Sequence, residues 1–299
     1  MFEEAQLYSP VTQSEDGAVT VHLGVDHPGI KDPEYRARRN AIAASALAWT
    51  PGTQPLPITY TDAENEVWRL VCAELAAKHE RYAVKEFLAA KDAVGLPTDR
   101  VPQLAEVTDR LTPLTGFVYH PAPGLVDLRT FYGSLARGSF LSTQYVRHPS
   151  QPLYTPEPDI IHEVIGHGNM LGSPRFAALK RAAGAATERV QTDAALQMIA
   201  DVFWFTLEFG VLYEDGELRA YGAGILSSYG EIEEFRGADL RPLDLLEMGT
   251  LEYDITKYQP VLFCADSIGQ LEDVVGGFFA EFDDDTPARL ASSRAALRT

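Results

Sequence analysis

Two histidines and a glutamate lie within six positions of one another, in the segment 160–167 (IIHEVIGH). Imidazole nitrogens and carboxylate oxygens are common ligands of divalent metals. Zinc-protease helices carry His-Glu-x-x-His, with histidines four residues apart on one face. His162 and His167 are five apart, which leaves them about 140° out of line at about 100° per residue of α-helix. They can still share a metal if Gly166 lets the backbone turn at the helix end. The spacing argues against a zinc protease and permits either a metal pair or two structural histidines.

A two-histidine site needs a third ligand, and one carboxylate would complete a facial triad with open positions on Fe(II). The segment Thr192–Leu212 predicts a long buried helix, because it is apolar on nearly every face. It nevertheless contains Asp201 and Glu208, which are seven residues apart and share a face. A carboxylate on such a helix must be paired or bound to metal. The pattern selects these two residues without choosing between them.

Arg147 lies just before a segment with four prolines, 149–158, which predicts a constrained loop. A guanidinium can bind a substrate carboxylate through two parallel hydrogen bonds. The alternative is a structural ion pair, for example with Asp159, which is also the predicted N-cap of the helix that carries His162.

The remaining pattern predicts a mainly helical protein with a few short β-strands. Pro33 begins a predicted helix that runs to about Trp49, and Thr61 with Glu64 has the form of a capping box at the start of another. No internal repeat or composition break requires a second domain. We therefore expect an N-terminal arm over 1–25, one catalytic domain over 26–282 and a polar C-terminal tail over 283–299.

The composition excludes several classes of protein. Of the 299 residues, 45% are hydrophobic and 23% are charged, which excludes a disordered chain. The net charge of −18 opposes binding to nucleic acid. The one dense basic run, Arg36, Arg38 and Arg39, is expected to be a solvated helix face. The sequence contains neither a signal-peptide pattern nor an apolar run long enough for a membrane helix, so a cytoplasmic protein is expected.

Eight motifs in the same order resemble the tetrahydropterin-dependent aromatic amino acid hydroxylases, from about Asp26 to about Phe282. They are 26–29 (DHPG), 31–33 (KDP), 35–39 (YRARR), 143–148 (TQYVRH), 154–159 (YTPEPD), 162–167 (HEVIGH), 204–210 (WFTLEFG) and 220–228 (AYGAGILSS). The resemblance implies a single, mostly helical catalytic domain that uses Fe(II), a tetrahydropterin such as tetrahydrobiopterin, and O2. It assigns the iron ligands to His162, His167 and Glu208.

The resemblance also implies roles for the residues around the iron. Arg147 matches the residue that binds the substrate carboxylate, Phe131 the aromatic ring that stacks on the pterin, and Glu163 the carboxylate that faces the pterin. A further four residues match the substrate pocket, and the last of them also matches a hydrogen-bond partner of a ligating histidine: Thr155, Pro158, Trp204 and Ser227.

The expected substrate is L-phenylalanine, hydroxylated at the para position to give L-tyrosine. Trp204 resembles the phenylalanine and tyrosine enzymes, and Ile255 stands where tyrosine hydroxylases tend to have an aspartate. The segment 168–170 (GNM) differs from the Val-Pro-Leu that often follows the second histidine, and Asp127-Leu128 replaces small polar residues. Both differences bear on pocket shape, so a phenylalanine 3-hydroxylase that forms meta-tyrosine stays open, as does a tryptophan hydroxylase.

Two alternatives with a different kind of function stay open as well. A non-catalytic metal- or pterin-binding protein could keep the same scaffold, although all three iron ligands and Arg147 are present. A zinc hydrolase would act without O2 or pterin. The animal enzymes of the family carry a regulatory domain and a tetramerisation helix that this chain has no room for, so a monomer is expected.

Overall fold

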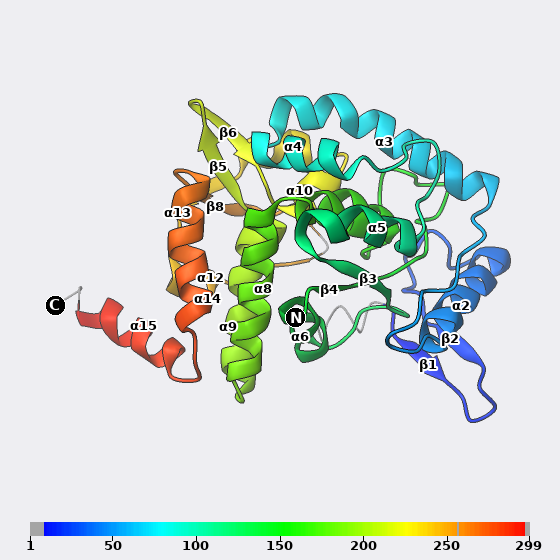
Figure 1. Cartoon of the computed structure of the whole chain (residues 1–299), viewed down its shortest axis with the longest axis horizontal. Helices are drawn as coiled ribbons and strands as arrows, with labels where there is room; N and C mark the ends of the chain where they lie inside the picture. The colour runs from blue at the N-terminus through cyan, green and yellow to red at the C-terminus, as the bar shows by residue number, and fades with distance from the viewer. Residues whose placement is uncertain (1–8, 256, 297–299) are drawn as a thin grey trace.

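The computed structural model describes residues 9–255 and 257–296, without the side chains of residues 294–296. Figure 1 shows long helices packed around the middle of the molecule, with short strands between and beside them. The longer α-helices are α2 (Pro33–Leu47), α3 (Asp62–Tyr82), α4 (Lys85–Val94), α5 (Leu104–Thr115), α6 (Leu128–Ala136), α8 (Pro174–Arg189), α9 (Asp193–Phe203) and α15 (Thr286–Ala296). The prediction of a mainly helical fold with a few short strands is confirmed.

Shorter helical turns connect these elements. The α-helical ones are α7 (Asn169–Leu171), α10 (Ala223–Ser227), α11 (Glu231–Glu234), α12 (Leu245–Met248), α13 (Ile268–Leu271) and α14 (Gly277–Glu281). The others are a 3-10 turn η3 (Phe235–Gly237) and the π-helical segments η1 (His162–Gly168), η2 (Trp204–Glu208) and η4 (Glu272–Gly276). Two of the π-helical segments, η1 and η2, contain the candidate metal ligands.

The strands form three small sheets. Strands β1 (Val11–Gln13) and β2 (Val19–Val21) pair antiparallel, and β3 (Val118–Pro121) pairs parallel with β4 (Ser139–Ser142). The third sheet has the order β6-β5-β8-β7, in which only β5 and β6 are antiparallel. Its strands are β5 (Val211–Glu214), β6 (Glu217–Ala220), β7 (Asp239–Pro242) and β8 (Val261–Ala265).

Local sequence signals account for several of these boundaries. The capping box at the start of α3 is present: the Thr61 hydroxyl accepts the Glu64 N–H at 3.2 Å, and the Glu64 carboxylate accepts the Thr61 N–H at 2.7 Å. The proline-rich segment 149–158 is an irregular loop, as predicted. The predicted helix Thr192–Leu212 is shorter than expected, because η2 ends at Glu208 and the chain enters β5 at Val211.

The two ends of the chain contain regular structure. Residues 1–8 of the expected N-terminal arm lie outside the described residues, and the rest form the β1–β2 hairpin. Strand β2 is attached to α2, because the Asn40 side chain accepts the Val21 N–H at 2.8 Å. Residues 297–299 of the expected polar tail also lie outside the described residues, and 286–296 of it form helix α15. The proposed domain limits stay predictions.

The basic run on α2 is not simply a solvated face. Arg39 is only 4% exposed, and its guanidinium donates to the Glu157 carboxylate at 2.7 Å and stacks on Tyr145 at 3.4 Å. Arg38 donates twice to Glu64, at 3.0 Å each. Burial of a guanidinium is stable only when it is paired, and Glu157 supplies the partner from the proline-rich loop. The prediction of solvated arginines is therefore wrong for Arg39.

Helices α6 and α8 pack so closely that a side chain at Gly184 is excluded. A methyl group there would lie 2.2 Å from the backbone nitrogen of Ala136 and 2.6 Å from the carbonyl oxygen of Tyr132. We predict that Gly184→Ala lowers the free energy of unfolding by about 1–3 kcal/mol or more, because the backbones must separate. Chemical denaturation measures this change.

The matched control is Gly277→Ala, at a helical position where a methyl group meets no described heavy atom within 4 Å. It should leave stability unchanged or raise it by up to about 1 kcal/mol, the gain in helix propensity. Equal stability of the two variants would contradict the close-packing argument.

Candidate active site

The five-residue spacing of His162 and His167 is explained by the π-helix η1. A π-helix closes its turns with hydrogen bonds five residues apart, so residues five apart face the same way, which they do not on an α-helix. Their Nε2 atoms lie 3.1 Å apart, and their rings meet edge to face with centroids 4.8 Å apart. Gly166 does not act by turning the chain. A methyl group on it would lie 2.7 Å from the carbonyl oxygen of Ala223, so its role is to let α10 approach η1.

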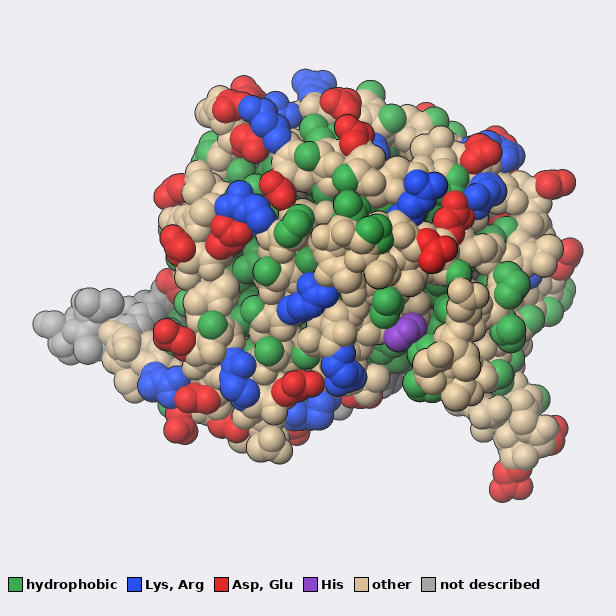
Figure 2. Space-filling view, viewed as in Figure 1, with side chains coloured by type: hydrophobic (Ala, Val, Ile, Leu, Met, Phe, Trp, Pro, Cys, Tyr) green, Lys and Arg blue, Asp and Glu red, His purple; other side chains and the backbone are tan. Residues whose placement is uncertain are grey.

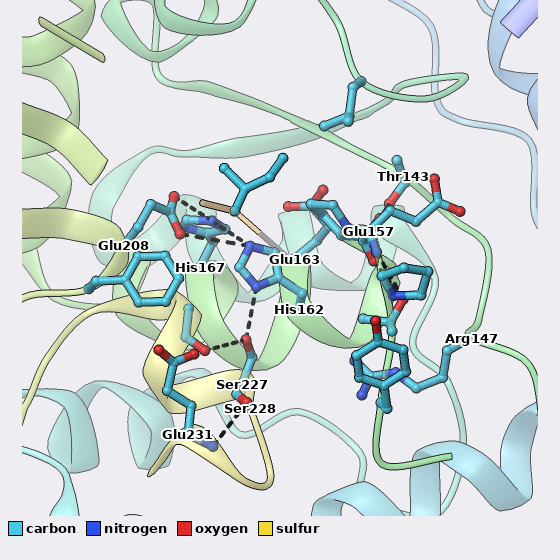
Figure 3. Close-up of a pocket in the computed structure, with 18 of the residues that line it drawn as sticks. Thr143, Arg147, Glu157, His162, Glu163, His167, Glu208, Ser227, Ser228 and Glu231 are labelled. Carbon is cyan, nitrogen blue, oxygen red and sulfur yellow. Dashed lines mark hydrogen bonds and ion pairs between the residues drawn. The ribbon is translucent and has the colours of Figure 1, made fainter. Parts of the chain in front are cut away.

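The structure brings Glu208 to the two histidines and leaves Asp201 elsewhere. The Glu208 carboxylate lies 3.0 Å from His167 Nε2 and 3.8 Å from His162 Nε2, and Figure 3 shows it directed at both rings. Asp201 is bound instead to Gln197 and Tyr253. The π-helical turn η2 ends at Glu208, so both groups of candidate ligands lie on π-helices.

Ser227 fixes the orientation of His162. Its hydroxyl donates to the carbonyl oxygen of Ala223 at 2.8 Å, and its oxygen lies 2.8 Å from His162 Nδ1. Because the hydroxyl donates its proton to the Ala223 carbonyl, the hydroxyl oxygen accepts the Nδ1–H of the imidazole. That tautomer leaves the lone pair of His162 Nε2 directed into the site, as a metal ligand requires.

Lys180 lies behind the other histidine. It is fully buried on α8, with its Nζ 2.8 Å from His167 Nδ1 and 4.9 Å from the ring centroid of Phe203. Burial lowers the pKa of Lys180 to about 8. Sequence reasoning missed this residue, because a lysine on an amphipathic helix is usually solvated.

The donor set fits a divalent cation. Burial lowers the pKa of His162 to about 4, which keeps this imidazole neutral, and burial also holds the pKa of His167 well below its usual range. Burial raises the pKa of Glu208, and burial together with the charge of Glu208 raises that of Glu163. Neutral imidazoles and carboxylates whose charge needs compensation are the ligand types that such a cation binds.

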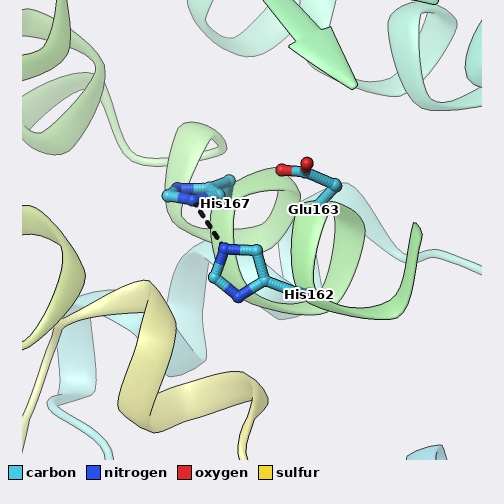
Figure 4. A group of neighbouring side chains, drawn as sticks. All are labelled: His162, Glu163 and His167. Atoms are coloured by element: carbon cyan, nitrogen blue, oxygen red, sulfur yellow. Dashed lines mark hydrogen bonds between the residues drawn. The ribbon is translucent and has the colours of Figure 1, made fainter. Parts of the chain in front are cut away.

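Glu163 is a second carboxylate near the pair. Ligand atoms of His162, Glu163 and His167 lie within 4.8 Å of one another, and Figure 4 shows the three on η1. Glu208 is the better third ligand, because its carboxylate contacts the Nε2 atoms of both histidines. Glu163 lines the same pocket and is free to face a second molecule.

A single pocket contains every residue to which the family resemblance assigned a role in the site. The lining residues from that set are Phe131, Arg147, Thr155, Pro158, His162, Glu163, His167, Trp204, Glu208 and Ser227. Ile255 also lines it, whereas the unusual segment 168–170 does not. The segment is buried directly after His167, and its influence on pocket shape stays a prediction. Asp127 also has a local role, since its side chain accepts the Thr130 N–H and caps α6.

Arg147 is paired with Asp159, the ion pair that the sequence offered as the alternative to substrate binding. Its Nε and Nη2 donate to the two carboxylate oxygens at 2.9 and 2.8 Å, and both side chains are buried. Asp159 also accepts the His162 N–H at 3.2 Å, as expected of the helix N-cap. The pair fixes one edge of the guanidinium, while Nη1 has no hydrogen bond among the described residues. The ion pair thus orients Arg147 in the pocket and leaves Nη1 for a ligand.

Phe209 and Tyr253 are among the pocket residues that were not candidates. Phe209 stacks obliquely on Trp204, with centroids 4.5 Å apart, and Tyr253 stacks on the same indole at 4.6 Å. Phe209 belongs to the 204–210 motif, but nothing in the sequence indicated that it lines the pocket. Tyr253 comes from a distant segment, and only the fold brings it to Trp204.

Comparison with known proteins decides the family. The family model for biopterin-dependent aromatic amino acid hydroxylases matches residues 14–289. The chain belongs to this family. It is therefore a pterin-dependent enzyme of the aromatic amino acid hydroxylase type.

Individual relatives agree with this membership. The chain is 50% identical over 265 residues to phenylalanine 3-hydroxylase of Streptomyces coeruleorubidus, covering 88% of this chain and 95% of the relative. It is 39% identical to rat phenylalanine-4-hydroxylase over 86% of this chain, and spans 58% of that longer protein. The structure of Chromobacterium violaceum phenylalanine hydroxylase with bound iron(III) and 7,8-dihydrobiopterin aligns with a TM-score of 0.72, at 28% identity, over 80% of this chain and 90% of that one.

The surface gives no sign of a membrane or nucleic-acid partner. Within the described ranges, no helix is both long and apolar enough to span a bilayer. Figure 2 shows acidic and basic side chains interspersed over the visible face. The expected absence of nucleic-acid and membrane partners stays a prediction.

We predict that Glu208→Gln weakens binding of Co(II) alone to the metal-free protein by more than about 100-fold. The reason is the loss of a charged ligand, which should exceed the 10–100-fold effect of removing a ligand's hydrogen-bond partner. Asp201→Asn, which removes the other candidate carboxylate, should bind Co(II) like the wild type. Titration followed by the visible absorption of Co(II) measures both. Normal affinity in Glu208→Gln, or loss in Asp201→Asn, would reverse the assignment.

The hydrogen bond from His162 to Ser227 should also support the metal. We predict that Ser227→Ala weakens Co(II) binding by about 10–100-fold, because the imidazole loses the partner that fixes its tautomer. Ser292→Ala, an exposed serine on α15, is the control and should have no effect. An unchanged affinity in Ser227→Ala would show that the hydroxyl does not orient the ring.

Proposed function

We propose that this protein hydroxylates the ring of L-phenylalanine with O2, at the para position, to give L-tyrosine, using Fe(II) and a tetrahydropterin. The observation that carries the proposal is the convergence of His162, His167 and Glu208 in the pocket that also contains Arg147 and Phe131. The proposal includes the expectation of a cytoplasmic monomer.

In this proposal His162, His167 and Glu208 hold the iron. Two imidazoles and one carboxylate form the facial triad typical of non-haem Fe(II) oxygenases. Bound there, iron and the pterin together supply the activation of O2 for transfer of one oxygen atom to the aromatic ring.

Arg147 binds the carboxylate of the amino acid. Arg147 lines the pocket, its Nη1 has no hydrogen bond to the described residues, and Asp159 keeps the guanidinium plane from rotating. The buried charge of Asp159 also compensates that of Arg147 when no substrate is bound. Substrate binding therefore adds a charge-assisted hydrogen bond to a group that is already oriented.

The walls of the pocket fit an unsubstituted aromatic ring. Trp204, Phe209 and Pro158 provide apolar surface, and Ile255 adds no group that could hydrogen-bond to a ring hydroxyl. Thr155 lines the same wall, with its hydroxyl donated to the Glu157 carbonyl at 2.6 Å. These contacts favour phenylalanine over tyrosine.

The pterin is assigned to the side of the pocket formed by Phe131 and Glu163. Phe131 lies on α6, packs edge-on against Phe140 and lines the pocket, so it is the aromatic ring proposed to stack on the pterin. Glu163 is buried, and burial together with Glu208 raises its pKa, so it suits hydrogen bonding to the nitrogen-rich pterin ring.

Para attack is favoured by the way the side chains pack beside Trp204. Figure 3 shows Arg147 and Glu208 on opposite sides of His162, so an amino acid held at Arg147 points its ring end towards the triad. Phe209 fills one flank, because a methyl group on Gly224 would lie 2.5 Å from its ring. Because Phe209 occupies this side of the pocket, it opposes the sideways shift of the substrate ring that would bring the meta carbon to the metal.

Meta hydroxylation is the second candidate, because the chain is 50% identical to a phenylalanine 3-hydroxylase. Aerobic incubation with Fe(II), a tetrahydropterin and L-phenylalanine, with the isomers resolved by chromatography, distinguishes the two. Para-tyrosine supports the proposal and meta-tyrosine supports the second candidate. Hydroxylation of L-tryptophan alone, or turnover without O2 and pterin, would contradict both.

We predict that Arg147→Lys raises the KM for L-phenylalanine by about 10–100-fold, since the substrate loses a charge-assisted hydrogen bond worth about 1.5–3 kcal/mol. The lysine keeps a positive charge beside Asp159, so Co(II) affinity should stay unchanged. Arg100→Lys, at an exposed ion pair with Glu106, is the control. Steady-state kinetics measure the effect, and an unchanged KM would remove Arg147 from the substrate site.

A further inference from the structure

Asp201 is a buried carboxylate that the proposed reaction does not use. It is 7% exposed on the apolar helix α9, and burial raises its pKa to about 6. Its Oδ1 accepts two hydrogen bonds from described residues, from Gln197 Nε2 at 2.8 Å on the same helix and from the Tyr253 hydroxyl at 3.2 Å. A buried carboxylate costs free energy unless it is well paired, so these contacts call for an explanation.

Tyr253 connects Asp201 to the substrate pocket. Its ring stacks on Trp204, with centroids 4.6 Å apart and an interplanar angle of 15°, and meets Phe205 edge-on at 5.1 Å. The same tyrosine lines the pocket that contains the metal-ligand candidates. The contact with Asp201 thus acts on the aromatic wall from outside the metal site.

The wall is not held by packing alone. Tyr253 also borders a second cavity, lined by Leu251, Tyr258 and Pro260 among others. Part of Tyr253 therefore borders a cavity, where it has fewer packing contacts. The hydrogen bond from its hydroxyl to Asp201 anchors the ring parallel to the indole.

Among the described residues, one hydrogen bond holds an edge of the Trp204 indole. Its Nε1–H donates to Gln259 Oε1 at 3.2 Å, and the backbone N–H of Gln259 donates to the Glu231 carboxylate at 2.8 Å. One hydrogen bond leaves the indole able to tilt about that edge. The stacked ring of Tyr253 is what limits this tilt on one face.

We propose that Asp201 is a positioning residue for the substrate ring: by binding the Tyr253 hydroxyl it holds Tyr253 flat against Trp204 and so sets which ring carbon faces the iron. This inference rests on the proposed function and adds a determinant of ring position to it. Asp201 contacts neither substrate nor metal and acts only through Tyr253.

The test compares Asp201→Ala, Asp201→Asn, Tyr253→Phe and the double variant Asp201→Ala/Tyr253→Phe. Asp193→Ala, an exposed aspartate at the start of the same helix, is the control. The readouts are the ratio of meta- to para-tyrosine and the amount of amino acid hydroxylated per pterin oxidised. A purely structural role would change stability and total activity without changing either ratio.

We expect the minor isomer to rise, and the coupling to fall, by about two- to tenfold in Asp201→Ala and in Tyr253→Phe, as for loss of one hydrogen bond. Asp201→Asn should resemble the wild type, because its amide oxygen still accepts the tyrosine hydroxyl. The double variant should equal either single variant, because both remove the same interaction. Wild-type ratios in Tyr253→Phe, or additive effects in the double variant, would overturn the inference.

A readout that needs no turnover separates this inference from the proposed function. The chain has three tryptophans, so its indole N–H signals in an NMR spectrum are few, and Trp204→Phe identifies the one of interest. That signal should shift in Tyr253→Phe and Asp201→Ala but not in Asp193→Ala. A wild type that forms no hydroxylated phenylalanine would overturn the proposed function. An unshifted indole signal would overturn the positioning role itself.

Discussion

The wide turn of the π-helix at His162–Gly168 is the constraint on which the site depends. An α-helix would point the two imidazoles in different directions, whereas the π-helical turn brings their Nε2 atoms to 3.1 Å. A second π-helical turn ends at Glu208 and places its carboxylate beside both rings. Such turns are rare because their geometry is less favourable than that of an α-helix, so the surrounding contacts must hold them.

Those contacts also decide what the buried groups can do. The Ser227 hydroxyl at Nδ1 directs the Nε2 lone pair of His162 to the centre, and His167 Nε2 faces the same centre with Lys180 behind its ring. Burial keeps both imidazoles neutral and makes the charge of Glu208 costly. A cation at the centre would relieve that cost, which links the stability of the site to the metal.

The substrate side of the pocket also contains a buried charge with a compensating partner, and here the charge is positive. Arg147 is buried, and the bidentate bond to Asp159 both compensates its charge and aims it. Farther out, Arg39 and Glu157 form another buried pair that ties the proline-rich loop to α2. The pocket is therefore built from paired buried charges around one aromatic wall. Trp204 lies in that wall between Phe209 and Tyr253, and a hydrogen bond to Gln259 holds its indole edge.

The sequence alone was enough for the helical fold, the capping box of α3 and the irregular proline-rich loop, which depend on local patterns. Through the motifs shared with the family, it also pointed to many of the residues that line the pocket. The spacing of the histidines could not reveal the π-helix, because that conformation is set by packing against α10 rather than by local preference. The residue pattern left Glu208 and Asp201 open, the family resemblance chose Glu208, and the structure places Glu208 beside both histidines. The burial of Arg39 and Lys180 and the contact of Tyr253 with Trp204 were decided only by the tertiary structure. Each depends on residues distant in sequence, and no periodicity along the chain records such a contact.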